Sequence, residues 1–192
     1  MKNKKEDMKK RAVCPWWLGY FLISPFRKFR QDPYKILGPY LREGIRCLDL
    51  GPGMGYFSIP MGELVGTSGK VYCVDIQKKM LEKLKERVQK RKLEKIIETR
   101  LCSEDSLEIS DLSSSLNFIL AFAVMHEVKD KQQTLNQLYS SLKPAGQLLI
   151  SEPLKHVTEF EMQQTIDNAE EVGFKLIDRP RINFSISALL KK

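Results

Sequence analysis

Three glycines at alternate positions follow an apolar stretch in the first third of the chain. Residues 48–57 read Leu-Asp-Leu-Gly-Pro-Gly-Met-Gly-Tyr-Phe, which places the glycines at Gly51, Gly53 and Gly55. Glycine accepts positive φ angles and, because it has no Cβ, lets a ligand approach the backbone. A helix that begins after such a turn presents free N–H groups and the positive end of its dipole. The pattern predicts a site for a nucleotide-type ligand.

An acidic residue follows at the end of the next apolar segment. Asp75 lies 24 residues after Gly51, where it can accept hydrogen bonds from both ribose hydroxyls of a ligand bound at the first turn. One residue separates Gly53 from Gly55, whereas a dinucleotide fingerprint has two residues there. No Lys-Ser or Lys-Thr pair follows, which argues against a phosphate-binding P-loop. Together these features favour an adenosine cofactor.

Strand-like and helix-like segments that would position these residues alternate from residue 45 onward. This alternation predicts an α/β fold, a doubly wound, Rossmann-like sheet of seven mostly parallel strands with helices on both faces. In such sheets the ligand lies beyond the carboxyl ends of the strands, where the strand order reverses. The expected strands cover residues 45–50, 70–76, 96–102, 116–123, 147–152, 174–178 and 183–190, with a turn at 143–146, and the expected helices cover 33–41, 56–65, 78–92, 131–142 and 160–172.

The first residues differ in composition from the rest of the chain. Residues 1–34 are predicted to form a basic tail and an aromatic extension, and residues 35–192 the main domain. Trp16, Trp17 and Tyr20 lie in the aromatic part. They either wall the substrate side of the site, or pack on the sheet edge or on a dimer partner, or contact a membrane surface beside the basic tail. No segment is apolar enough for enough residues to span a bilayer.

The chain of 192 residues carries a formal charge of +8, unevenly distributed. Residues 78–100 contain ten lysines or arginines and four glutamates. This is either one solvated helix face or a surface for RNA or an acidic partner. No aromatic residue stands among these lysines to stack on bases, which argues against nucleic-acid binding. Nucleic-acid binding stays an alternative because of the basic charge. The four cysteines are widely spaced and predicted to be reduced in a cytoplasmic protein, and no metal site is expected.

Three motifs in register resemble the class I S-adenosylmethionine-dependent methyltransferases. Residues 48–55 (LDLGPGMG) resemble the first motif of that family, residues 74–76 (VDI) its second-strand acid, and residues 142–150 (LKPAGQLLI) its turn into strand five. The resemblance covers residues 36–190 and is closest to the small-molecule branch with ubiquinone and menaquinone relatives. It implies S-adenosylmethionine as cofactor and a small-molecule methyl acceptor.

The resemblance also implies roles for individual residues. Asp49 would meet the methionine amino group, Asp75 the ribose hydroxyls and Ile76 the adenine face. The family's usual Gly-Asp-Ala after strand three reads Cys-Ser-Glu-Asp at 102–105, so either Glu104 or Asp105 would contact the adenine amine. The expected cofactor contacts are Asp49, Gly51, Pro52, Gly53, Gly55, Tyr56, Phe57, Asp75, Ile76, Met80, Ser103, Glu104 and Ala121.

Two histidines are expected where the methyl group would be presented. His126, after strand four, either acts as a general base or packs on the cofactor and hydrogen-bonds to backbone. Glu152 and His156, after strand five, are expected on the substrate side with His126, Trp16, Trp17 and Tyr20.

The function expected from these features is methyl transfer to a small molecule. The alternatives are an RNA methyltransferase and a non-catalytic S-adenosylmethionine-binding partner protein. Neither an Asn/Asp-Pro-Pro-Tyr motif nor a cysteine stands at residues 121–124, which argues against two routes of base methylation. A monomer and a homodimer are both compatible with the sequence.

Overall fold

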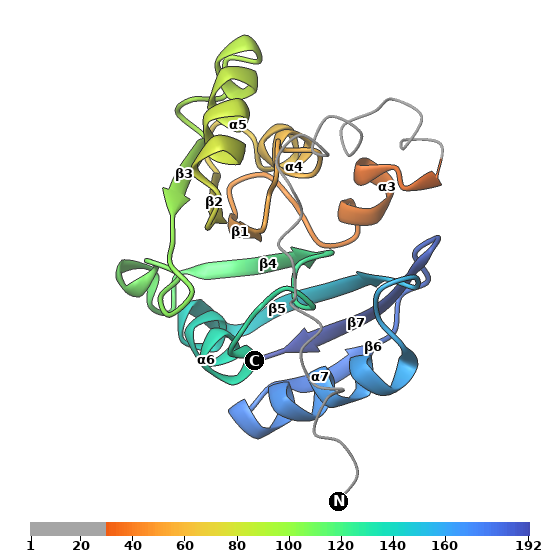
Figure 1. Cartoon of the computed structure of the whole chain (residues 1–192). Coiled ribbons are helices and arrows are strands. Elements are labelled where there is room, and N and C mark those ends of the chain that lie inside the picture. The colour runs from red at the N-terminus through yellow and green to blue at the C-terminus, as the bar shows by residue number, and fades with distance from the viewer. Residues whose placement is uncertain (1–29) are drawn as a thin grey trace, which may run out of the picture.

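Residues 30–192 are described by the computed structural model, so Trp16, Trp17 and Tyr20 lie outside the described part of the chain. Within it, one sheet of seven strands has the order β3-β2-β1-β4-β5-β7-β6 (Figure 1). The strands are β1 (Arg46–Leu50), β2 (Lys70–Asp75), β3 (Ile97–Leu101), β4 (Leu116–Phe122), β5 (Leu142–Pro153), β6 (Lys175–Asp178) and β7 (Ser185–Lys191). The helices are α3 (Pro33–Leu37), α4 (Ser58–Val65), α5 (Lys78–Lys90), α6 (Lys131–Ser141) and α7 (Glu159–Val172), with the 3₁₀ turn η2 (Ser110–Leu112).

The strand directions confirm the predicted fold class. Strands β1 to β5 pair in parallel, and β7 pairs antiparallel with both β5 and β6. The chain runs outward from β1 to β3, then returns to place β4 on the other side of β1. The strand order therefore reverses between β1 and β4, and ligands of open α/β sheets bind at this point.

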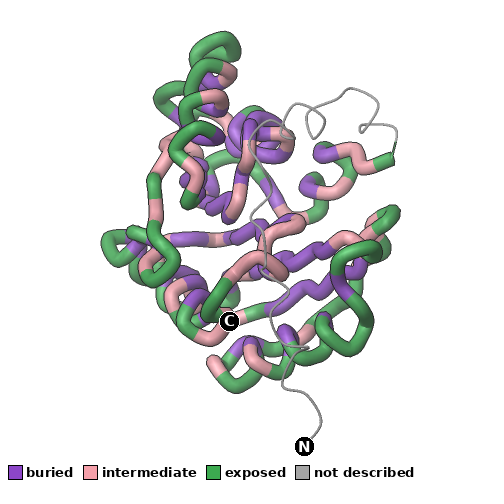
Figure 2. Tube along the Cα trace, viewed as in Figure 1, coloured by how far each residue is buried: buried purple, intermediate pink, exposed green. Residues whose placement is uncertain are grey.

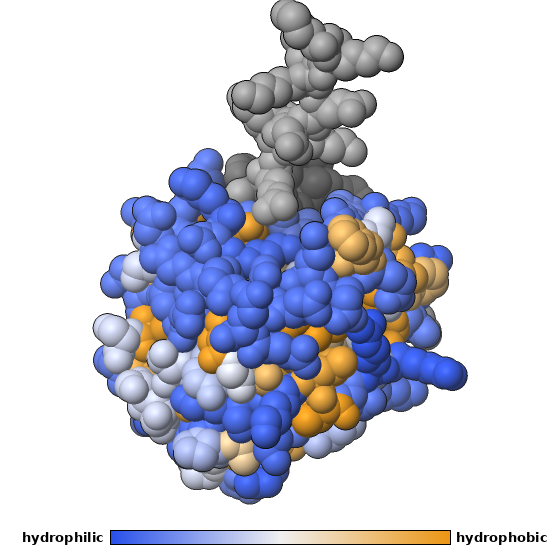
Figure 3. All heavy atoms as spheres, turned by 90° about the horizontal axis from the view of Figure 1, so that it is seen from below, coloured by the Kyte–Doolittle hydropathy of each residue, from blue (hydrophilic) through white to orange (hydrophobic). Residues whose placement is uncertain are grey.

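Two apolar clusters, one on each face of the sheet, form the core. Side chains of a strand alternate between faces, so Leu48 and Leu50 join the cluster that includes residues of α6 and α7. Cys47 joins the cluster that includes residues of α4 and α5. Figure 2 shows burial concentrated along the central strands, as expected when helices cover both faces. On the face that Figure 3 shows, apolar areas alternate with hydrophilic surface.

Local chemistry explains where the helices begin and end. Helix α7 begins at a capping box, in which Thr158 and Glu161 bond each other's backbone N–H groups, and ends at Gly173 with φ 115°. The expected helix over 33–41 is wrong at its end, because α3 stops at Leu37. Gly38 still has helical angles, with φ −50° and ψ −40°, but Pro39 has no backbone N–H with which to continue the helical hydrogen bonds.

The region before the fifth strand also differs from the prediction. Residues 143–146, expected as a separate turn, lie inside β5, which runs from Leu142 to Pro153. The pairing with β4 shifts register there, and Ala145 takes a φ of 64°. Backbone bonds to Lys192 at 3.1 and 3.0 Å hold this bulge against the end of β7. Among residues 30–192, no helix is long and apolar enough to cross a membrane.

Candidate active site

The glycine turn connects the end of β1 to the start of α4. Gly51 donates its N–H to the carbonyl of Val74 at 2.9 Å, which ties the turn to β2. Gly51 has a φ of 67°, and a Cβ there would come within 2.6 Å of Val124 Cγ2. Gly55 has a φ of 84°, and its Cβ would come within 2.4 Å of Leu84 Cδ1. Both positions therefore require glycine for backbone geometry and for packing.

Gly53 differs from its neighbours because it faces open space. Its φ is 53°, yet a Cβ at this position would meet nothing within 4 Å. Its N–H points to Asp75 Oδ2 at 3.3 Å, a long hydrogen bond. The opening beside a backbone N–H and a carboxylate fits a ligand with hydroxyl groups that passes close to the main chain. The chain's own residues thus fit the adenosine part of the expected cofactor.

Asp75 is held at the end of β2 by backbone donors. Its Oδ1 accepts from the N–H of Gln77 at 2.8 Å, which fixes the carboxylate beside the turn. Burial, together with the negative charge of Glu127, raises the pKa of Asp75 to about 6. The bonds from backbone N–H groups of Gln77 and Gly53 act in the opposite direction. The charged carboxylate is therefore only moderately favoured near neutral pH.

Asp49 occupies the other side of the turn, on the sheet face covered by α4. It is buried, and its Oδ2 accepts from Ser58 Oγ at 2.5 Å, at the first residue of α4. Burial raises the pKa of Asp49 to about 7; the Ser58 bond lowers it, and the charge of Asp75 raises it. Asp49 thus joins the end of β1 to the start of α4. Its contact with a methionine amino group stays a prediction.

The exposed residues expected to line the adenine lie along one edge. The N–H of Cys102 bonds the carbonyl of Asp75 at 3.0 Å, which brings the residues after β3 beside the acid. Ile76 is 40% exposed, as an adenine face would require. Glu104 is also exposed and pairs with Lys129 at 3.1 Å. A ligand amine could displace that solvent-facing pair at little cost.

Most of the remaining expected cofactor residues are buried. Phe57 is buried and its ring lies 4.4 Å from that of Phe122, centroid to centroid. The hydroxyl of Tyr56 donates to the carbonyl of Gln31 at 2.8 Å. Pro52, Met80 and Ala121 are buried as well.

The chain turns sharply after β4, at the edge where the acceptor is expected. Ala123 takes a φ of 56° and donates its N–H to the carbonyl of Ser151 at 2.7 Å. Glu127 then donates its N–H to the carbonyl of Val124 at 2.9 Å. A positive φ is energetically costly for alanine, so the surrounding contacts must hold Ala123 in this conformation. Nothing in the sequence signals it, because alanine has no preference for that conformation.

Glu152 organises this turn from the neighbouring strand. The side chain is 2% exposed, and its Oε1 accepts from the N–H of Met125 at 2.7 Å. Its Oε2 pairs with Nδ1 of His126. The rings of His126 and His156 lie 5.3 Å apart. The structure therefore places His126, Glu152 and His156 together, with a link through Met125 that the sequence did not reveal; their role on the substrate side stays a prediction.

The charge on His126 is set by opposing effects. Burial lowers the pKa of His126, but the hydrogen bond and charge of Glu152, with the charge of Glu127, raise it above the usual value. Lys131 acts in the opposite direction. No group of three His, Cys, Asp or Glu side chains among residues 30–192 is arranged to hold a metal ion.

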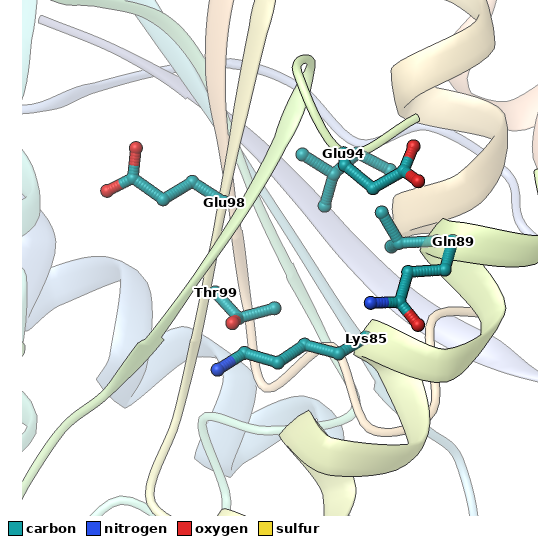
Figure 4. Close-up of a pocket in the computed structure, with 7 residues that line it drawn as sticks. Lys85, Gln89, Glu94, Glu98 and Thr99 are labelled. Carbon is teal, nitrogen blue, oxygen red and sulfur yellow. The ribbon is translucent and has the colours of Figure 1, made fainter. Parts of the chain in front are cut away.

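Two surface cavities lie away from the glycine turn and from His126. One, of about 330 Å³, lies between α5 and β3, where Lys85 and Gln89 face Thr99 (Figure 4). The other, of about 800 Å³, is lined by residues around η2 and α6, such as Ile109 and Gln133. Neither cavity is lined by the glycine turn, Asp75, His126 or Glu152, but Asp105, one of the two candidates for the adenine-amine contact, lines the second.

Comparisons with known proteins identify the family. A family model described as "Methyltransferase domain" matches residues 41–179. The chain is 31% identical over 119 residues to ubiquinone/menaquinone biosynthesis C-methyltransferase UbiE of Cronobacter sakazakii, covering 62% of this chain and 47% of that protein. It is 30% identical over 163 residues to the arsenite methyltransferase of Aquipseudomonas alcaligenes, covering 78% of this chain and 46% of that protein.

A solved structure matches over nearly its whole length. The crystal structure of a SAM-dependent methyltransferase from Aquifex aeolicus superimposes with a TM-score of 0.84 at 23% identity, covering 93% of this chain and 99% of that one. At that identity the likeness concerns the fold. The chain spans about half the length of the curated relatives that it matches.

Proposed function

The chain belongs to the class I S-adenosylmethionine-dependent methyltransferases, in the UbiE-like branch, and on this premise we propose that it methylates a small-molecule acceptor. S-adenosylmethionine is the cofactor of this family. The RNA methyltransferase is less favoured, because no aromatic residue interleaves with the basic residues over 78–100. The non-catalytic binding protein is the alternative that a turnover assay tests.

One observation carries the proposal: Gly53 and Asp75 lie side by side near the point where the strand order reverses. The open space at Gly53 admits a ligand against the backbone, and the Asp75 carboxylate lies within 3.3 Å of its N–H. A vicinal diol would complete the bonding of that carboxylate. Asp75 accepts the ribose hydroxyls, while the exposed Ile76 covers one face of the base.

The chemistry needs positioning more than acid or base strength. When bound, S-adenosylmethionine supplies a methyl group activated by a positive sulfur. The residues of this chain then have to hold the acceptor in line and keep water out. The turn over residues 123–127 is fixed by Ser151 and Glu152, so that His126 stands at the acceptor side. The role of Trp16, Trp17 and Tyr20 in closing that side stays a prediction.

We favour an organic acceptor over arsenite. Trivalent arsenic is a soft centre that binds cysteine sulfurs, which must be accessible and lie close together. Among the described residues, Cys47 and Cys73 are buried in strands, and burial raises the pKa of both thiols. Burial also raises the pKa of Cys102, to about 11. These cysteines are free thiols, in keeping with the proposed cytoplasmic location, and the burial of Cys47 and Cys73 keeps their sulfurs away from an arsenic ligand.

Calorimetry and turnover together test the proposal. We expect the protein to bind S-adenosylhomocysteine with a dissociation constant in the micromolar range and to transfer a labelled methyl group to at least one of a panel of phenols, hydroquinones, thiols and amines. A folded protein that binds neither S-adenosylmethionine nor S-adenosylhomocysteine would refute the proposal. Binding without turnover on any acceptor, including RNA, would favour the non-catalytic alternative.

A further inference from the structure

The carboxylate of Glu152 is fully committed inside the protein. One oxygen accepts from the backbone N–H of Met125 at 2.7 Å, and the other contacts Nδ1 of His126. The side chain is 2% exposed, whereas that of His126 is 20% exposed. The negative charge of a buried carboxylate is costly unless hydrogen-bond donors or a positive partner compensate it. Glu152 therefore fixes both the turn after β4 and the imidazole that projects from it.

This arrangement selects one form of the histidine ring. A carboxylate can only accept, so Nδ1 of His126 carries the hydrogen. In the neutral ring, Nε2 is then the atom with a free lone pair. Nε2 lies 3.9 Å from Glu127 Oε1, beyond hydrogen-bond distance, and the partly exposed ring lies 5.3 Å from that of His156, centroid to centroid. The ring is thus held by one nitrogen and presents the other at the edge of the site.

We propose that Glu152 is a positioning residue that holds His126 with Nε2 as a proton acceptor, and that the site takes acceptors which lose a proton on methylation. Phenols, hydroquinones and thiols belong to this class, and tertiary amines and pyridine-type nitrogens do not. The inference rests on the proposed function for the identity of the methyl donor. The placement of the histidine does not depend on it.

The proton and electron balance of the step is complete with these groups. The acceptor's electron pair forms the bond to the methyl carbon. The carbon–sulfur bond breaks and its pair stays on sulfur, which loses its positive charge. The proton of the acceptor passes to Nε2 of His126, and the resulting imidazolium is stabilised by Glu152 through Nδ1. Because the ring is partly exposed, it can return the proton to water after the products leave.

Four groups face the imidazole and set its response to pH. Glu152 contacts Nδ1, Glu127 lies near Nε2, His156 packs against the ring, and Lys131 opposes protonation from α6. Burial and Lys131 lower the pKa of His126, but the two carboxylates outweigh them, so this pKa lies above the usual histidine value. A base of this kind gains efficiency as the pH rises through its pKa, since only the neutral ring accepts a proton.

The free protein provides the first test, through nitrogen-15 NMR of the histidine rings. We expect Nδ1 of His126 to be protonated in the neutral ring, and the pKa of His126 to fall in Glu152→Gln. The amide of that variant can accept from Met125 with its oxygen and donate to Nδ1 with its nitrogen, which moves the hydrogen to Nε2. Glu170→Gln, an exposed acid on α7, is the matched control and should change neither property. A hydrogen on Nε2 in the wild-type neutral ring would overturn the inference.

Turnover provides the second test, with 1,4-naphthohydroquinone, catechol and 2-mercaptoethanol as acceptors. We expect Glu152→Gln to bind S-adenosylhomocysteine within about twofold of wild type and to lose roughly 10²–10⁴-fold in kcat. Should that variant fold poorly, His126→Ala serves instead, and added imidazole should restore part of its activity. Wild-type rates in either folded variant would overturn the inference. Failure of the wild-type protein to bind the cofactor would instead refute the proposed function and leave the NMR result to decide the histidine's placement.

Discussion

Replacement of Asp75 by alanine should weaken cofactor binding much more than it weakens the fold. The carboxylate bonds the N–H groups of Gln77 and Gly53, at 2.8 and 3.3 Å, and has room to accept ribose hydroxyls. Each bond to a charged group contributes about 1.5–3 kcal/mol, offset by rehydration of the donors once they are exposed. We therefore expect a loss of about 1–3 kcal/mol in binding, which is roughly a 5- to 150-fold rise in the dissociation constant.

Isothermal titration with S-adenosylhomocysteine measures this change directly. Asp167→Asn, an exposed position on α7, is the control and should leave the dissociation constant within about twofold of wild type. Circular dichroism and urea unfolding would show that the Asp75→Ala protein is folded at the assay temperature. An unchanged dissociation constant in a folded Asp75→Ala protein would contradict the assignment of the carboxylate to the cofactor.

Three further predictions concern pH and the glycine turn. Burial raises the pKa of Asp75 to about 6, so protonation should reduce the affinity for S-adenosylhomocysteine by roughly tenfold between pH 7 and pH 5. The affinity of Asp75→Asn should depend much less on pH over the same range. The pKa of Asp49 is raised to about 7, so the folded state binds more protons than the unfolded state between about pH 4 and pH 7, and the unfolding free energy should fall as pH rises through that range. This contribution is at most about 4 kcal/mol, at 1.36 kcal/mol per pH unit of pKa shift. Urea unfolding of Asp49→Asn should show a flatter dependence of the unfolding free energy on pH than wild type. The same slope in both proteins would exclude Asp49 as its source. Gly51→Ala places a Cβ within 2.6 Å of Val124 and should lose about 2–4 kcal/mol of stability. Gly53→Ala meets no atom within 4 Å and should lose only about 1 kcal/mol of stability. Because its Cβ would occupy the space left for the ligand, Gly53→Ala should nevertheless bind the cofactor at least tenfold more weakly. Equal stability losses in these two variants, measured by chemical denaturation, would contradict the geometry of the turn.

Local sequence patterns were sufficient for most of the secondary structure. In α5, Met80, Leu81, Leu84 and Val88 recur at helical spacing and are all buried, so periodicity alone located the helix. The end of α3 and the bulge at residues 143–146 were predicted incorrectly. The first depends on Pro39 two residues beyond the helix, and the second on backbone pairing with Lys192, which is distant in sequence.

The cofactor side of the site was also accessible from the sequence, because the fold makes its parts neighbours. Gly51 and Gly53 follow β1 directly, and Asp75 ends the adjacent parallel strand. Parallel strands that pair in register bring their carboxyl ends to the same edge of the sheet, so the pattern of residue types was enough to place the acid beside the turn.

The acceptor side depended on tertiary structure. The sequence alone determined a class I methyltransferase fold, an S-adenosylmethionine-type turn and two histidines near its far edge. Only the parallel pairing of Phe122 with Ser151 brings Glu152 under the turn after β4, where it meets Met125 and His126. That contact joins residues 26 and 27 positions apart through one buried carboxylate. Its position depends on strand register and burial, which no local pattern of residues encodes.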